Sequence, residues 1–136
     1  ITCYTAVGPA AGAQRAAQIT LARAEKILAQ DSNNGSAMGY GVSALAMLGE
    51  AERAREWINR ALLIEPDNMN MRYNFACAMT TLREHDVALE ILVPVFETAH
   101  IDRLNHAKVD PDLDPIRKDP RFEAMVANAA ARLAAG

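Results

Sequence analysis

Three aspartates that alternate along the chain, Asp110, Asp112 and Asp114, could begin a calcium-binding loop. Such a loop needs a glycine at its sixth position and a bidentate glutamate at its twelfth. Pro115 stands at the sixth position and Arg121 at the twelfth, so the pattern departs from calcium binding at both. Aspartates spaced in this way are typical of residues that cap turns and helices, and that is the role we expect.

Two other sets of residues could do chemistry. His100, Asp102 and His106 are zinc-ligand types, but two histidines with this spacing on one helix diverge, so we expect them to be solvated. Cys77 has no histidine or lysine placed by sequence to activate it, and we expect a small groove or core residue. No phosphate-binding glycine loop, nucleophile–base spacing or carboxylate pair stands out. The chain itself is therefore predicted to be non-catalytic, with no catalytic residue, cofactor or metal.

The composition narrows the class of protein. The 136 residues suffice for one continuous core, and abundant alanine with only 5% aromatic residues favours helices over sheets. A formal net charge of −3 and an isoelectric point near 5.6 argue against nucleic acid or an anionic membrane as a direct partner. Cys3 and Cys77 are too few for a disulfide framework, which favours a cytoplasmic setting. The opening Ile1-Thr2-Cys3 suggests a piece of a longer protein.

The element that organises the chain is an amphipathic helix predicted from about Glu50 to Ile64, after Gly49 and before Pro66. Its apolar residues fall three or four apart on one face: Ala51, Ala54, Ile58, Ala61 and Leu62. The charged residues lie mostly elsewhere, and Glu56 precedes Arg60 in the favourable order. The small alanines allow a second helix to approach closely.

This stretch recurs later in the chain at a constant offset, which we call the repeat interval. The interval joins five identical pairs: Ala44 and Ala78, Leu48 and Leu82, Glu50 and Glu84, Ala54 and Ala88, and Glu56 and Glu90. Helix pairs with a period of about 34 residues are typical of tetratricopeptide repeats. Ala54-x3-Ile58 followed by Pro66 resembles the second-helix signature of that family, and Ala88-x3-Leu92 repeats it. The first helices, Met38 to Leu48 and Arg72 to Leu82, match more loosely and lack the usual Trp and Leu-Gly pair.

The resemblance implies an all-α fold, a right-handed solenoid of stacked helix pairs closed by a helical C-terminal cap. We expect one domain over 1–136, with a partial repeat over 1–34, repeats over 35–68 and 69–102, and the cap over 103–136. In the partial repeat, a helix from about Gln14 to Gln30 follows a truncated or irregular partner, Ile1 to Ala13. Pro94 predicts a kink in the helix from about Glu84 to Thr98.

We expect the repeat interval to end near His100. Beyond it, three Asp-Pro steps (at Asp110, Asp114 and Asp119) suit turns or helix starts, and the last begins a helix to about Leu133. Such a piece can cover the last apolar surface of a solenoid.

The resemblance also implies a binding surface, because the first helix of each repeat lines a concave groove in this family. The residues carried over to it are Ser36, Gly39, Tyr40, Ser43, Met47, Asn70, Tyr73, Asn74, Cys77 and Thr81. Of the cationic and amide clamp by which some members hold a terminal carboxylate, only Asn74 is present, so we do not expect that clamp. A neutral groove with two tyrosines suits an extended or helical protein segment. The segment can come from a partner or from the same polypeptide. Gly39 and Gly41 indicate either tight helix packing or close approach of a ligand backbone.

The tail resembles the C-terminus of bacterial multidomain signalling proteins in two sequence motifs, D-P-D-L-D-P-I-R and D-P-R-F. In those proteins tetratricopeptide repeats follow a class III adenylate or guanylate cyclase or a winged-helix regulator. The sequence therefore predicts a non-catalytic protein–protein interaction module in a larger bacterial cytoplasmic protein. Two alternatives stay open. The chain can be the C-terminal segment of an enzyme, such as a class III cyclase, whose active site lies upstream, or it can be a homodimerisation module.

Overall fold

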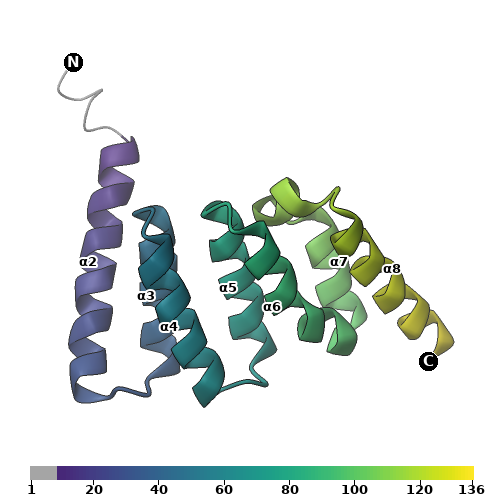
Figure 1. The fold of residues 1–136 in the computed structure, drawn as a ribbon, viewed down its shortest axis with the longest axis horizontal. Coiled ribbons are helices and arrows are strands. Elements are labelled where there is room, and N and C mark those ends of the chain that lie inside the picture. Colours follow the sequence, from purple (N-terminus) through teal and green to yellow (C-terminus); the bar gives the residue numbers. More distant parts are fainter. Residues whose placement is uncertain (1–8) are drawn as a thin grey trace. The chain divides into compact units, whose positions relative to one another are not determined.

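The computed structural model describes residues 9–136, with side-chain surroundings from residue 11 onward. All regular elements in that part are helices, which confirms the all-α class. They are α2 (Pro9–Gln30), α3 (Gly35–Met47), α4 (Ala51–Ile64), α5 (Met69–Thr81), α6 (His85–Thr98), α7 (Ile101–Val109), the 3-10 helix η1 (Pro111–Ile116) and α8 (Pro120–Ala135), shown in Figure 1. No helix among them combines the length and the apolar character needed to cross a membrane.

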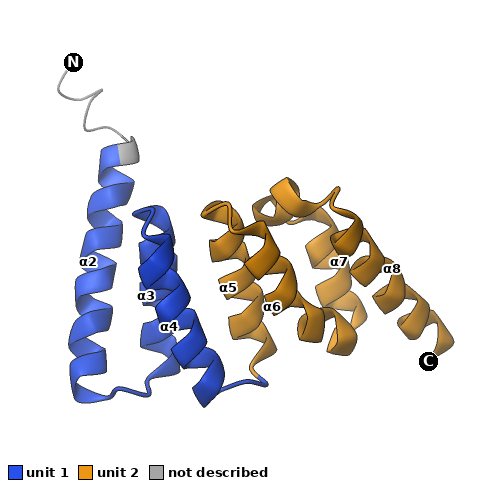
Figure 2. Cartoon of the chain, in the orientation of Figure 1, with its two compact units in different colours: residues 1–67 blue, residues 68–136 orange. Residues whose placement is uncertain are grey.

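The chain divides into two compact units, one ending at Asp67 and the other beginning at Asn68 (Figure 2). In the first unit, α3 packs against both α2 and α4. In the second, α6 packs against α5 and α8, α5 also contacts η1, and α7 contacts α8. The boundary falls one residue before the expected junction between the stretches 35–68 and 69–102. The grouping of 1–136 into a single domain stays a prediction.

Equivalent caps begin the first helix of each predicted repeat. The Asn34 side chain accepts a hydrogen bond from the backbone N–H of Ala37 at 2.9 Å, and the Asn68 side chain accepts one from Met71 at 3.0 Å. Asparagine at this position satisfies one of the N–H groups that have no partner within the helix. Both repeats therefore start α3 and α5 by the same local chemistry.

The same two helices also end alike. After α3, the N–H of Glu50 bonds to the carbonyl of Leu45 at 2.9 Å, and Gly49 has a positive φ of 75°. After α5, the N–H of Glu84 bonds to the carbonyl of Met79 at 2.8 Å. Here Arg83, with φ 63°, holds the left-handed position that glycine normally takes. Each helix is thus turned back sharply so that the second helix of the pair can pack on it.

Alanines mark the tightest contacts between paired helices. Ala54 in α4 and Ala88 in α6 are fully buried, as are Ile58 and Leu92 one turn further on. In α8, buried Phe122 and Ala129 lie one repeat interval after Ala88 and Val95. The buried face therefore keeps the repeat interval beyond His100, where the sequence pattern was expected to end it.

Gly41 explains the close approach of α3 and α4. A Cβ atom added to Gly41 would lie 2.0 Å from Cζ3 of Trp57, so the indole ring occupies the space that a side chain would fill. Near Gly39, in contrast, a Cβ atom would meet nothing within 4 Å. Tight packing is therefore the role of Gly41, and Gly39 faces open space.

The N-terminal helix differs from its expected start. Helix α2 begins at Pro9 rather than Gln14, so residues 9–13 continue the helix instead of forming part of a separate partner. Proline suits the first helical turn, where its missing N–H is not needed. The rest of the expected partner, residues 1–8, and Cys3 lie outside the described residues.

Two of the three Asp-Pro steps start helices, as predicted. Asp110 caps η1 by accepting the N–H of Asp112 at 3.0 Å, and Asp119 caps α8 by accepting the N–H of Arg121 at 2.8 Å. The middle step, Asp114-Pro115, lies inside η1. Pro94 lies inside α6, which continues through it from His85 to Thr98, and the kink there stays a prediction.

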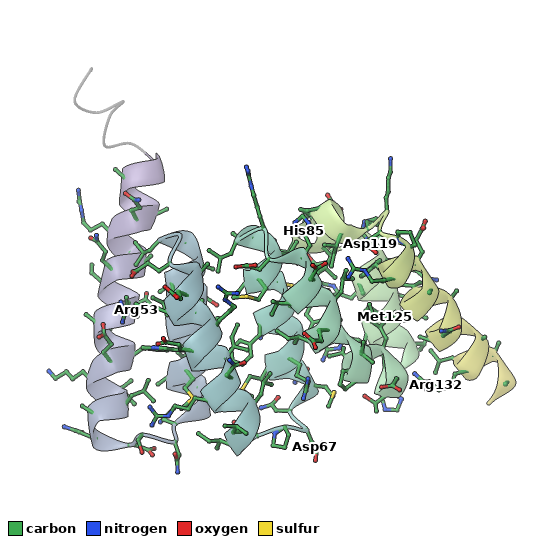
Figure 3. The ribbon with its side chains drawn as sticks, in the orientation of Figure 1. Arg53, Asp67, His85, Asp119, Met125 and Arg132 are labelled. Atoms are coloured by element: carbon green, nitrogen blue, oxygen red, sulfur yellow. The ribbon has the colours of Figure 1, made fainter. Side chains whose placement is uncertain are left out.

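Two arginines satisfy the carbonyl groups at helix ends in the second unit. Arg117 donates to the carbonyls of Ala107 at 2.8 Å and Lys108 at 2.6 Å, at the end of α7. Arg132 of α8, labelled in Figure 3, donates to the carbonyls of Phe96 at 3.1 Å and Ala99 at 2.5 Å, at the end of α6. A cation at a helix C-terminus also interacts favourably with the helix dipole. The bonds of Arg117 thus join the end of η1 to α7, and those of Arg132 join α8 to the end of α6.

The two glycines of α3 provide a matched pair of variants. Gly41→Ala should lower the free energy of unfolding by about 1 kcal/mol or more, because the strain of overpacking against Trp57 exceeds the gain in helix propensity. Gly39→Ala should raise it by about 0.5–1 kcal/mol, because only the propensity gain remains. Urea denaturation followed by circular dichroism measures both changes. If the two variants gain stability equally, Gly41 is not held by packing.

Candidate functional site

On α3, the structure places four of the predicted groove residues together. Tyr40 is 66% exposed and Met47 is 54% exposed, and the smaller Ser36 and Ser43 lie on the same face and are also exposed. These four residues form what we call the α3 stripe. Gly39 precedes Tyr40 in the sequence, and a Cβ atom there would meet no atom of a more distant residue within 4 Å. The stripe thus offers one aromatic ring, one flexible thioether and two hydroxyl groups to solvent.

On α5, the predicted residues divide into two groups. Asn70, Asn74 and Thr81 are exposed, and Cys77 is half-buried. Tyr73 departs from the expectation of an open groove, because it is only 4% exposed. Side chains from α7 and from the residue after that helix cover its ring and its hydroxyl group.

Three residues cover Tyr73. The hydroxyl of Tyr73 donates a hydrogen bond of 2.6 Å to Oδ2 of Asp110. The guanidinium carbon of Arg103 lies 4.9 Å from the centre of the tyrosine ring, a cation–π distance, and Arg103 also donates to Oδ1 of Asn70. The His106 ring lies 5.8 Å from the tyrosine ring, with the two planes tilted by 45°. In the second unit, the chain itself therefore occupies part of the predicted ligand surface.

The charge on Asp110 organises this cluster. Burial alone would raise the pKa of Asp110, which is 7% exposed. Hydrogen bonds from the Tyr73 hydroxyl and the Asp112 N–H, with the nearby His106 imidazole, outweigh burial and hold the pKa below its ordinary value. Nε2 of His106 lies 3.2 Å from Oδ2 of Asp110. The carboxylate is therefore kept ionised although it is buried.

The pKa values of the neighbouring Tyr73 hydroxyl and Cys77 thiol are shifted in the opposite direction, upward. Burial, followed by the hydrogen bond to Asp110 and the charge of that carboxylate, raises the pKa of Tyr73. Burial, followed by the charges of Asp110 and Asp112, raises the pKa of Cys77 to about 12. Cys77 is therefore a neutral thiol at pH 7 and a poor nucleophile, as expected for a residue that does no covalent chemistry.

One group of metal-ligating side chains converges in the part of the chain that the structure describes. Potential ligand atoms of Cys77, Asp110 and Asp112 all lie within 4.8 Å of one another. Asp114, the third of the alternating aspartates, is bound instead by Arg117 at 3.0 Å. None of His100, Asp102 and His106, the zinc-ligand types considered from the sequence, is in that group.

Each unit also has a surface hollow that lies away from the predicted groove residues. In the first, a hollow of about 430 Å³ is lined by Glu25, Leu28, Ala29, Met38, Glu56, Trp57 and Arg60. In the second, a hollow of about 480 Å³ is lined by Asp86, Leu89, Glu90, Val93, Arg121 and Met125. None of the predicted groove residues lines either hollow. The α3 stripe therefore lies outside both hollows.

Sequence analysis missed Arg103, His106 and Asp110 as the residues that cover Tyr73. Asp110 was recognised as a cap, but nothing in its neighbourhood indicates that it pairs with a tyrosine 37 residues earlier. The available signal was the repeat interval. Continued past His100, it places 103–109 in the position of 69–75, as a further first helix packing against α5.

Compared with known protein families, curated proteins and solved structures, the chain matches no family model and shows no significant similarity to any of those proteins or structures.

The hydrogen bond from Tyr73 to Asp110 should contribute measurably to stability. Tyr73→Phe removes the hydroxyl and leaves a buried carboxylate without one of its donors, which should cost about 1–3 kcal/mol at pH 7. Because the folded-state pKa of Asp110 is depressed, this stabilisation is present above the ordinary value of 3.8 and is lost as the pH falls through the folded-state value. The difference between variant and wild type in urea denaturation should therefore shrink as the pH falls below about 3.8.

Tyr40→Phe is the matched control, because the Tyr40 side chain is largely exposed. Tyr40→Phe should leave the free energy of unfolding unchanged both at pH 7 and below about pH 3.8. Equal effects of the two substitutions would mean that the Tyr73 hydroxyl stabilises nothing.

Proposed function

We propose that the chain is a non-catalytic protein–protein interaction module of the tetratricopeptide type, which binds a segment of a partner protein through the α3 stripe. The observation that supports this most directly is the contrast between the equivalent faces of α3 and α5. The face of α5 is partly covered by Arg103, His106 and Asp110. The α3 stripe carries an exposed tyrosine and an exposed methionine.

The chemistry of the stripe defines the class of ligand. Tyr40 provides a rigid amphipathic surface, Met47 adapts its shape to an apolar side chain, and the serines can bond to backbone amides. None of the four is charged, so charge pairing contributes little to recognition by the stripe itself. The ligand is then an extended or helical peptide segment with at least one apolar anchor residue.

The helix pairs support the family assignment in this proposal. Each pair is capped by asparagine at its start, turned at a left-handed residue, and packed at a buried alanine. The resemblance of the tail extends the proposal to the parent, a larger bacterial signalling protein that carries a cyclase or a winged-helix regulator upstream. Reading the residues that precede Ile1 in the parent gene tests that extension.

Selection from a random peptide library tests the binding function. Peptides selected on the immobilised chain should lose affinity about tenfold or more on Tyr40→Ala and on Met47→Ala, since central apolar contacts dominate such interfaces. Leu63→Ala is the matched control: Leu63 is an exposed apolar residue of the same unit that lies outside the stripe. Binding that is insensitive to Tyr40 and Met47, or an absence of any selected peptide, would contradict the proposal.

A second candidate function, homodimerisation, is favoured by the outer face of α2. Ala17, Leu21 and Ala24 form the buried face of this helix, yet Ile19 and Ile27, just over two turns apart, are exposed. Surface helices normally place polar residues there. Two copies that pack these faces together would remove both isoleucines from water.

Sedimentation equilibrium distinguishes this candidate. Dimers should form with rising concentration, and Ile19→Glu or Ile27→Glu should abolish them by placing a carboxylate in an apolar interface. Ile101→Glu, at an exposed isoleucine of α7, is the control and should leave association unchanged. A wild-type chain that stays monomeric at high concentration removes this candidate.

A further inference from the structure

The cluster beneath Tyr73 brings together donors of several kinds from two separate elements. Cys77 comes from the third turn of α5, whereas Asp110 and Asp112 lie at the junction of α7 and η1. Potential ligand atoms of these three residues lie within 4.8 Å of one another. Sulfur and carboxylate oxygen together are ligands that a borderline-soft divalent metal accepts.

We propose that Cys77, Asp110 and Asp112 form a binding site for a divalent transition metal, with Zn²⁺ as the fitting ion and a solvent molecule as the fourth ligand. The thiol proton of Cys77 passes to solvent as the sulfur–metal bond forms, so the site gains one positive charge in total. The site is distinct from the α3 stripe and does not depend on the proposed peptide binding.

The donor set decides which class of ion fits. Ca²⁺ and Mg²⁺ prefer oxygen ligands in sets of six or more, and three side chains of which one is a thiol do not meet that need. Zn²⁺ takes four ligands and accepts sulfur, nitrogen and carboxylate oxygen together. Bonds of about 2.0–2.3 Å to one central ion require ligand atoms roughly 3–4 Å apart, so only small movements of the three side chains are needed.

The surroundings of Asp110 support a ligand role. Its carboxylate accepts hydrogen bonds from the Tyr73 hydroxyl at 2.6 Å and from the Asp112 N–H at 3.0 Å, and these fix its orientation. Carboxylates that bind metals are commonly held in this way, and two oxygens with about four lone pairs leave capacity for an ion. Arg117 donates to the carbonyl of Asp110, which fixes the backbone of the same residue.

The geometry also explains why the sequence did not indicate the site. Metal-binding motifs are recognised from ligands a few residues apart, but Cys77 and Asp110 are distant in sequence and belong to different helices. The cluster forms only because η1 packs against α5. The sequence offered the calcium-like aspartates as a candidate, and the structure brings two of them, Asp110 and Asp112, together with Cys77.

Titration of the full chain with Co²⁺, followed by competition with Zn²⁺, tests the proposal. The Cys3→Ser chain is the starting protein, so that Cys77 is the only thiol. One equivalent of Co²⁺ should produce the charge-transfer absorption of a cobalt–thiolate bond, and Zn²⁺ should displace it stoichiometrically. Cys77→Ala should abolish the absorption, and Asp112→Asn, an exposed position, should weaken binding about tenfold or more.

Controls come from nearby residues of metal-ligating types. His100→Ala and Asp102→Asn should leave Co²⁺ binding unchanged. Circular dichroism establishes that each variant is folded, and Asp112→Asn keeps the test valid if Cys77→Ala unfolds. No saturable binding by the folded starting protein, or binding that survives both Cys77→Ala and Asp112→Asn, overturns the proposal.

Discussion

Close contact between paired helices depends on positions that have no room for another carbon atom. Ala54 and Ala88 are fully buried, and the Trp57 ring occupies the space that a side chain on Gly41 would need. At such contacts two helix backbones can approach more closely than larger residues allow, so dispersion contacts are many and little polar surface is trapped. In the second predicted repeat, Phe75 and Ile91 stand one repeat interval after Gly41 and Trp57, so a large residue of the first helix replaces the small one and a smaller residue replaces the indole.

The end of the second unit shows the consequence of losing the small residue. Phe122 stands in α8 at the position of Ala54 and Ala88, and it meets Phe96 edge to face, with ring centres 5.6 Å apart. An aromatic ring at this point requires more space than an alanine does. The segment before α8 is divided at Asp110-Pro111 into α7 and η1, and Arg117 bonds across the division to the carbonyls of Ala107 and Lys108. The C-terminal segment therefore keeps the repeat interval in its buried residues, although its backbone forms two short helices where the earlier stretches form one.

The parts of the molecule that a sequence can predict are those set by nearby residues. Helices such as 50–64 follow from local spacing, and the caps at Asn68 and Asp119 follow from side chains that bond to their own neighbourhood. The exposed positions of the α3 stripe follow from the same period. The burial of Tyr73 does not, because it depends on where α7 folds back, and that depends on contacts between residues far apart in the chain. The convergence of Cys77 with Asp112 is hidden from sequence for the same reason.

The different use of the two equivalent faces can be traced to one position. Tyr73 stands one repeat interval after Gly39, and its ring is the platform on which Arg103 and His106 lie. With glycine at that position, α3 has no ring to bind a guanidinium group from its own chain, and no hydroxyl to pair with a buried carboxylate. Its aromatic residue is instead Tyr40, one position later, where the helix turns the ring toward solvent. Moving the ring by one residue thus changes an internal anchor into an exposed contact surface, while the caps and the buried faces of the two helices stay the same.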